Sequence, residues 1–389
     1  MKKFALIVCL LALALGIGLY GVDKADDQVA KNAKRAYEKG IELAKRQQWD
    51  KAAEMFNEAI KLEPEWGPPY ASLAAMKRLQ NKFEEARQDY EKALNLRPEL
   101  IKSIAPEYAV TLINLGSQAM NDQEPEKSKE YFLKILDIPS MEAYDKKLYL
   151  NAVYLVGNVF TQMSQFEKAA SYFLKLIQMT ENQPEFSEFY ANGNYMAGIN
   201  LSQMKKYEEA SPYLLKYIDL NKGNANAAQF VVRADYMLGI NNYELLNLKS
   251  EQIMAEPLSA ERKAKMDRLQ QDKDKLSASP VAGSAQKIAE IEDEMTLIRN
   301  DDIKEKREKI AKAAQETEVE AFLASVIQNI PDLEDTYVRL GNYYYLCQNY
   351  EKAIEFYKKL IEKFPSSQDI SSYKKFLDLL EKESVAVKK

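Results

Sequence analysis

Apolar residues recur along the chain with helical spacing, and small residues stand at fixed places between them. The clearest example runs from 334 to 367. Its large apolar side chains are Tyr337, Leu340, Tyr344, Tyr357 and Leu360, its small residues are Gly341 and Ala353, and its proline is Pro365. The pattern predicts two helices that cross closely where the small residues meet. Because proline cannot continue a helix, the second helix should end just before Pro365.

The same pattern recurs through most of the chain. Residues 33–66 and 67–100 repeat it at a period of 34, with Gly40, Ala52, Phe56 and Pro64, then Ala74, Ala86, Tyr90 and Pro98. Further on, the glycines at 116, 157, 198 and 239 are spaced by 41 residues. Seven added residues correspond to two helical turns of ~3.6 residues each, so these units should have longer helices or longer joins.

This spacing resembles the tetratricopeptide repeat (TPR) motif, a helix-turn-helix unit of 34 residues. The resemblance implies an all-α fold, a TPR-like α-solenoid of about seven helix-turn-helix units. Residues 23–243 would hold repeats 1–5 and helix A of repeat 6. Residues 316–366 would hold helix B of repeat 6 and repeat 7, and 367–389 a C-terminal capping helix and tail.

Residues 244–315 depart from the repeat. They contain no aromatic residue and are rich in Lys, Glu, Asp and Gln, yet apolar residues recur at helical intervals: Leu258, Met266, Leu269, Leu276, Ile288, Ile291, Met295 and Ile298. The stretch 277–284, with Pro280 and Gly283, interrupts them. We expect a charged, coiled-coil-like helical hairpin inserted between helices A and B of repeat 6. A flexible charged linker is the alternative.

The N-terminal residues 1–22 begin with Lys2 and Lys3 and continue without a charge from Phe4 to Val22. This pattern is typical of a signal peptide or an N-terminal membrane anchor, and the two alternatives remain open. Both predict an exported protein, periplasmic or anchored to the inner membrane and facing outward.

The composition limits the chemistry of the chain. A formal net charge of −5 disfavours a nucleic-acid partner. The absence of histidine excludes His-based catalysis and His metal ligands, and the two cysteines, Cys9 and Cys347, cannot form a metal site by themselves. No glycine-rich phosphate loop or nucleophile–base pair is found. We therefore expect no catalytic residues, no metal, no cofactor and no enzyme activity.

The resemblance also indicates which residues would meet a partner, because positions 2, 5, 9 and 12 of helix A face the concave groove in TPR proteins. The candidate partner-binding residues on these positions are Tyr154, Asn158, Tyr195, Tyr236, Asn342 and Tyr345. Tyrosines with neighbouring amides can stack on a peptide and hydrogen-bond to it. The alternative is that the tyrosines only pack against neighbouring helices. No unit has Lys at position 5, so the carboxylate clamp of chaperone adaptors is not expected.

The resemblance implies a protein-binding scaffold or adaptor. The expected partner is a protein or peptide of unknown identity, and the expected setting is the assembly of a bacterial envelope. The alternative function is structural: a self-assembling protein that forms homo-oligomers through the helical hairpin or the ends of the array.

Overall fold

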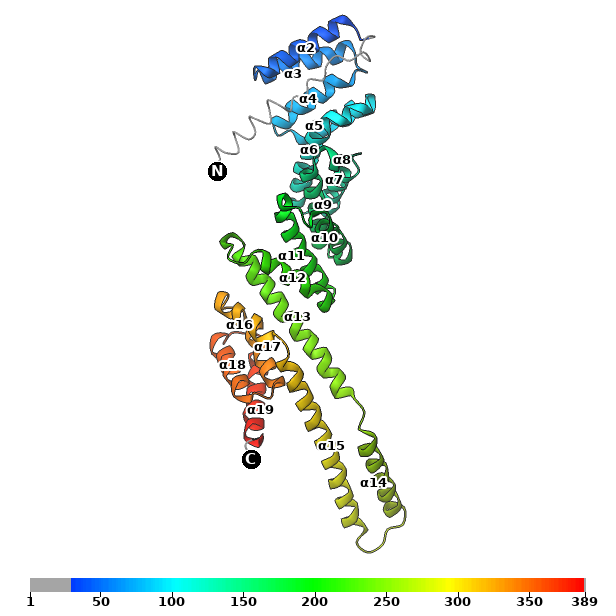
Figure 1. Ribbon diagram of the computed structural model, residues 1–389, viewed down its shortest axis with the longest axis vertical. Helices are drawn as coiled ribbons and strands as arrows, with labels where there is room; N and C mark the ends of the chain where they lie inside the picture. Colours follow the sequence, from blue (N-terminus) through cyan, green and yellow to red (C-terminus); the bar gives the residue numbers. More distant parts are fainter. Residues whose placement is uncertain (1–28, 388–389) are drawn as a thin grey trace. The chain divides into compact units, whose positions relative to one another are not determined.

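The computed structural model describes residues 29–387, and over that range it consists of helices joined by turns, with no β-strand (Figure 1). The expected signal peptide or anchor at 1–22 lies outside the described residues. The chain divides into two compact units, one up to Asn200 and one from Leu201, with the boundary inside α11 (Ser187–Gln203). The expected fold class, an all-α TPR-like solenoid, is confirmed.

The first unit is built from pairs of helices. The pairs are α2 (Lys31–Lys45) with α3 (Trp49–Leu62), α4 (Gly67–Leu79) with α5 (Phe83–Leu96), α6 (Ile101–Asn121) with α7 (Pro125–Leu136), and α9 (Lys146–Gln162) with α10 (Phe166–Thr180). Short helices η2 (Pro98–Leu100), α8 (Met141–Tyr144) and η3 (Pro184–Phe186) join some of the pairs. In the 34-residue repeats helix A has 13 to 15 residues, whereas α6 has 21 and α9 and α11 have 17 each. Part of the seven added residues in the 41-residue repeats therefore lengthens helix A.

A glycine on helix A receives a large side chain from helix B in most repeats. A Cβ placed on Gly40 would lie 2.6 Å from the Phe56 ring, and one on Gly157 would lie 2.7 Å from the Phe173 ring. Gly116 meets Phe132 in the same way. Each ring lies 16 residues after its glycine and is fully buried. The small residue is thus needed because a side chain there would occupy the space of the ring.

In each of six repeats, the turn that follows helix A contains one residue in the left-handed conformation. These residues occupy the same repeat position and have φ between 57° and 61°: Gln47, Asn81, Gln123, Ser164, Lys205 and Gln348. In each case the next amide bonds back to a carbonyl five residues earlier, as from Gln165 N to Phe160 O at 2.9 Å. This is the hydrogen bond of a Schellman motif, which satisfies the free carbonyls at a helix C-terminus.

Helix B ends where the proline predicts. Helices α3, α5, α16 (Val319–Asn329) and α18 (Tyr350–Lys363) each stop two residues before the proline at repeat position 32. These prolines are Pro64, Pro98, Pro331 and Pro365. The residue before a proline is driven out of the helical region by the pyrrolidine ring, so the helix ends before it.

The second unit contains the end of α11, α12 (Tyr207–Leu220), η4 (Ala225–Ala227), α13 (Ala228–Ala255), α14 (Ala260–Ala278), α15 (Ser284–Gln315), α16, α17 (Glu334–Leu346), α18 and α19 (Ile370–Val387). Helix α14 lies against α15, and α15 also contacts α13 and α17 (Figure 1). At the end of the chain α19 packs on α18, where the ring centroids of Phe376 and Tyr357 are 5.0 Å apart.

The glycine pairing shows where the insertion enters repeat 6. Gly239 on α13 faces Leu323 on α16, as glycines of other repeats face their rings. The two residues are 84 positions apart instead of 16, a difference of 68. Helix α16 therefore takes the place of helix B, and α14 and α15 lie in the connection between A and B. We expected helix A to end near 243, whereas α13 continues to Ala255.

The contact between the two inserted helices uses the expected apolar positions, and further along α15 ionic contacts replace the apolar ones. Met295 and Ile298 on α15 are buried, and Leu258, Met266, Leu269 and Leu276 are half-buried. Further along α15, the buried Lys306 lies 2.9 Å from Asp302. Lys306 Nζ also donates to the carbonyls of Met254 at 3.3 Å and Glu256 at 2.5 Å. This cation thus holds the C-terminal end of α13 against α15.

Candidate partner-binding surface

The A helices at the centre of the chain carry no charge over long stretches. Residues 108–121 of α6, 148–162 of α9 and 189–200 of α11 contain no Asp, Glu, Lys or Arg, although 29% of all residues are charged. The B helices beside them carry charge, for example Lys168 and Lys175 on α10. The distinction between the two sets of helices is therefore chemical as well as geometric.

Helix α9 places two of the candidate residues one turn apart. Tyr154 and Asn158 are both half-buried. The Tyr154 ring lies edge-on to Phe173 of α10, with 5.9 Å between the centroids. This contact restricts the orientation of the Tyr154 ring, and the half-buried side chain remains partly at the surface.

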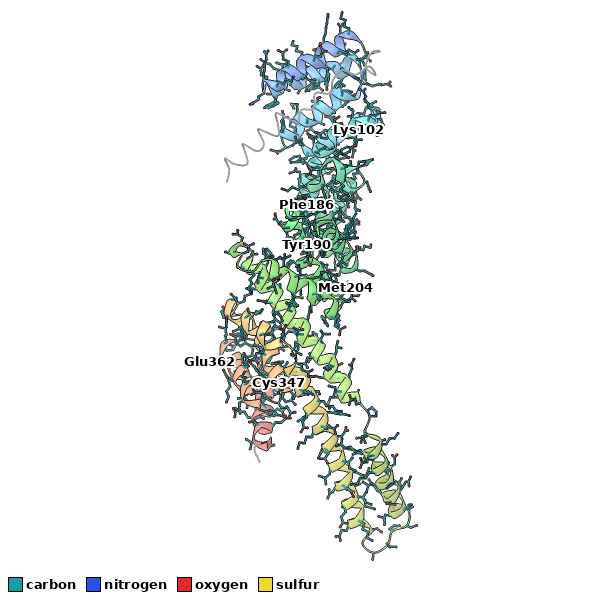
Figure 2. The ribbon with its side chains drawn as sticks, in the orientation of Figure 1. Lys102, Phe186, Tyr190, Met204, Cys347 and Glu362 are labelled. Carbon is teal, nitrogen blue, oxygen red and sulfur yellow. The ribbon has the colours of Figure 1, made fainter. Side chains whose placement is uncertain are left out.

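Helix α11 lies beside α9 and carries Tyr195, which is also half-buried. The two helices are joined by a hydrogen bond in which Thr161 Oγ1 donates to Asn200 Oδ1 at 3.0 Å. Near the start of α11, Phe186 (labelled in Figure 2) lies under the ammonium group of Lys146, 5.4 Å from its ring centroid. Tyr190, also labelled there, accepts a 2.8 Å hydrogen bond from Asn194 Nδ2 at its carbonyl. The first unit thus brings Tyr154, Asn158 and Tyr195 onto neighbouring A helices.

The three candidates in the second unit have partners within the chain. Tyr236 donates from its hydroxyl to Asp335 Oδ2 at 2.7 Å, and burial together with this bond raises the pKa of Tyr236. Asn342 Oδ1 accepts from the Tyr357 hydroxyl at 2.7 Å. The Tyr345 ring packs edge-on against Phe376, with centroids 5.4 Å apart. These contacts agree with a packing role for the three residues of the second unit. In the first unit, Tyr154, Asn158 and Tyr195 lie on the uncharged stretches of α9 and α11, which are the candidate surface.

Some features of the surface were not predicted. Asn151 of α9 and Asn192 of α11 occupy equivalent positions in their repeats, and both are half-buried. They add amide groups three residues before Tyr154 and Tyr195. The lack of charge along 148–162 could have been read from the sequence. No cluster of three or more His, Cys, Asp or Glu side chains suited to a metal ion occurs within residues 29–387. Over the same residues, no helix has the length and apolar character needed to cross a bilayer.

Comparison with known proteins identifies the repeat. Models of the tetratricopeptide repeat match residues 70–100, 191–224 and 334–367. An uncharacterized protein of Methanocaldococcus jannaschii is 32% identical over 74 residues, which are 19% of this chain and 86% of that protein. The chain therefore contains tetratricopeptide repeats, and these repeats are characteristic of scaffolds for protein–protein interaction.

Solved structures of other repeat proteins are similar at low identity. YrrB, described as a TPR protein with an unusual peptide-binding site, is 18% identical with a TM-score of 0.36, over 54% of this chain and 95% of its own. A TPR protein from Parabacteroides merdae is 15% identical with a TM-score of 0.35, over 90% and 100%. Part of a TPR protein from Cytophaga hutchinsonii is 13% identical with a TM-score of 0.38, over 87% and 98%. At these values the similarity carries no information about ligands.

Proposed function

We propose that this protein is a non-enzymatic scaffold that binds a peptide or protein segment on the A helices of its first unit. The observation that carries the proposal is the lack of charge along 108–121 of α6, 148–162 of α9 and 189–200 of α11, where Tyr154, Asn158 and Tyr195 remain half-buried instead of fully buried. Elsewhere in the chain, surface helices carry frequent charges that keep the protein soluble. A neutral, amide-rich surface instead favours contact with a partner.

The chemistry of this surface suits recognition of a backbone. Asparagine side chains offer both donors and acceptors, which match the N–H and C=O groups of an extended or helical segment. Tyrosine adds a broad apolar ring with a hydroxyl at its end. Because no charged side chain takes part, the affinity should depend little on salt concentration.

The proposed setting is outside the cytoplasm, in the assembly of a bacterial envelope. The support is in the sequence: Lys2 and Lys3 precede an uncharged apolar stretch to Val22, and acidic residues follow it. A basic start before such a stretch is typical of export or of anchoring with the remainder of the chain facing outward.

The test compares single substitutions on matched tyrosines. Tyr195→Ala should weaken capture of the native partner about tenfold while thermal unfolding changes little, a loss of roughly 1.4 kcal/mol. Tyr131→Ala, which removes a half-buried tyrosine of the B helix α7 whose hydroxyl donates to Glu84 of the B helix α5, should leave capture unchanged. If Tyr195→Ala lowers the melting temperature by several degrees and capture persists, Tyr195 serves packing and the proposal fails.

Self-assembly through the insertion is the competing function. Met295 and Ile298, the most buried apolar residues of the expected stripe, already pack within the hairpin. Ion pairs such as Lys265–Glu294 at 2.7 Å and Lys273–Glu292 at 2.5 Å flank that contact. A mass in solution that rises with protein concentration, and returns to the monomer value when the hairpin is shortened, would favour self-assembly over the scaffold.

A further inference from the structure

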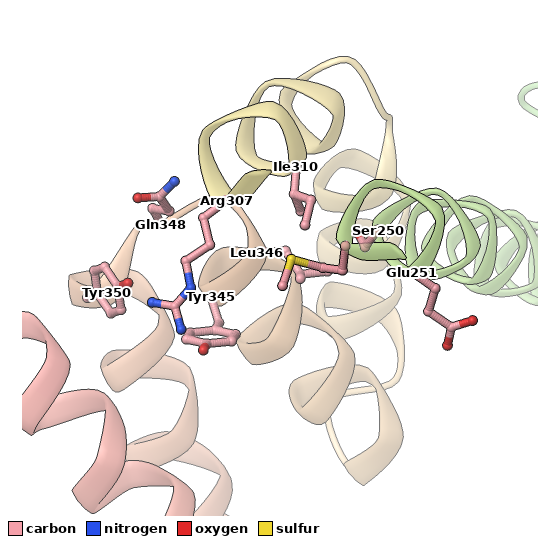
Figure 3. A pocket seen from close by; sticks show the side chains of 9 residues that line it. Ser250, Glu251, Arg307, Ile310, Tyr345, Leu346, Gln348 and Tyr350 are labelled. Atoms are coloured by element: carbon pink, nitrogen blue, oxygen red, sulfur yellow. The ribbon is translucent and has the colours of Figure 1, made fainter. Parts of the chain in front are cut away.

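A pocket lies at the root of the insertion, within the second unit. It encloses about 320 Å³ between the end of α13, the last part of α15 and the end of α17. Apolar side chains form its walls: Met254, Ile310, Leu346 and the rings of Tyr345 and Tyr350. Figure 3 shows Ile310, Leu346 and Tyr345 converging on the space. The extended end of α13 supplies Met254 and the inserted helix α15 supplies Ile310. Both segments lie outside the basic repeat, so the pocket is specific to the modified repeat 6.

One end of the pocket is cationic. Figure 3 shows the guanidinium group of Arg307 beside Tyr345 and Tyr350, whereas the carboxylate of Glu251 points away from them. The Arg307 side chain is 45% exposed, and its ion pair with Glu383 of α19 spans 3.7 Å. That distance exceeds hydrogen-bond length, and a guanidinium carries five N–H donors. A second carboxylate can therefore reach Arg307 from the pocket side.

We propose that this pocket binds the C-terminal residue of a partner protein when that residue has a large apolar side chain. The side chain would lie between Met254, Ile310 and Leu346, and the terminal carboxylate would accept hydrogen bonds from Arg307. A chain end carries an apolar side chain and a carboxylate on one residue, which matches a pocket with apolar walls and a single arginine. The volume is near the lower limit of ligand pockets, roughly 300 Å³, which suits one residue better than a cofactor.

The neighbouring residue Glu383 predicts the direction in which a substitution should change the binding of a carboxylate ligand. Glu383 lies close to Arg307 and repels an incoming carboxylate, and its Oε2 atom is buried without a hydrogen-bond partner in the described residues. Removing its charge in Glu383→Gln should therefore tighten the binding of a carboxylate ligand. The same substitution should have little effect on a ligand whose carboxylate is replaced by an amide.

The experiment uses the intact protein with ¹³C-labelled methionine methyl groups. The Met254 signal is assigned with Met254→Leu, and N-acetyl-phenylalanine is titrated beside its C-terminal amide. We expect a saturable shift of the Met254 signal by the acid, with a dissociation constant on the order of 1 mM for so small a ligand. Arg307→Gln should weaken this binding at least tenfold, and Glu383→Gln should strengthen it.

The control is Lys304→Gln, which removes a positive charge from an exposed position on the same helix, outside the pocket. It should leave the titration unchanged. Equal shifts by the acid and the amide, or unchanged binding in Arg307→Gln, would overturn the assignment of the carboxylate to Arg307. No saturable shift at roughly ten times the expected constant would overturn the pocket as a binding site. None of these outcomes involves the A helices of the first unit, so they leave the proposed scaffold function unaffected.

Discussion

Single small residues determine how closely the two helices of a repeat approach. At Gly116 the approach is close enough for Ser128 Oγ of the B helix to donate to the glycine carbonyl at 2.8 Å. At Gly341 the Tyr357 ring fills the space that a Cβ would occupy, at 2.6 Å. These residues were predicted from the sequence because only their spacing and size were needed. The partners of Asn342 and Tyr236 could not be predicted, since hydrogen bonds between helices far apart in sequence depend on side-chain orientation.

Gly157→Ala tests this packing at one position. The added methyl group would meet the Phe173 ring, so we expect the free energy of unfolding to fall by about 1–3 kcal/mol. Thermal or urea unfolding measures the loss. Phe173→Leu in the same chain should recover part of it, because the smaller side chain leaves room for the methyl group. A neutral effect of Gly157→Ala would contradict the account of the glycines.

At the scale of elements, the turns after helix A explain why repeat 6 differs from the others. The repeat position that is left-handed in six repeats is occupied in repeat 6 by Leu246, which is buried and remains helical within α13. A bulky apolar residue disfavours the left-handed conformation. Burial of the Leu246 side chain instead stabilises the continued helix α13. The sequence contained this signal, but the expected end near 243 followed only the repeat length. Helix B ends were predictable because proline acts locally.

Ser164→Gly and Gln162→Gly should have opposite effects. Ser164 has φ of 57°, so glycine relieves strain there and should stabilise the protein by up to about 1 kcal/mol. Gln162 is the last residue of α9, and glycine at this exposed helical site should destabilise by up to about 1 kcal/mol. The comparison by urea unfolding is direct, because the two sites are two residues apart. Equal effects of the same sign would contradict the turn assignment.

The ionic part of the insertion should be sensitive to the loss of Lys306. Lys306→Met would leave the buried Asp302 without its nearest cation and free two carbonyl groups at the end of α13, at a cost of about 3 kcal/mol. Amide hydrogen exchange should then accelerate in 260–315. Lys309→Met removes an exposed cation one turn away and should change exchange little. Similar exchange in both variants would show that Lys306 does not hold the insertion.

Across the whole molecule, charge and neutrality are divided between different helices. The insertion and the B helices carry much of the charge, while residues 108–121, 148–162 and 189–200 of the central A helices in the first unit carry none. The repeat pattern made the fold predictable from the sequence, because it depends on local periodicity. The pocket at Arg307 was not predictable, since α13, α15, α17 and α18 contribute residues to it from Ser250 to Tyr350, far apart in the sequence.

The most direct test of the scaffold is site-specific photocrosslinking in the intact protein. A photoreactive phenylalanine replaces Asn158 or Asn192 on the A helices, and Tyr131 on the B helix α7 as control. We predict that both A-helix positions crosslink to the same partner segment, with yields that stay constant from about 0.1 M to about 1 M salt because no charge takes part. Crosslinks confined to position 131, or A-helix crosslinks lost at high salt, would contradict the proposed scaffold surface.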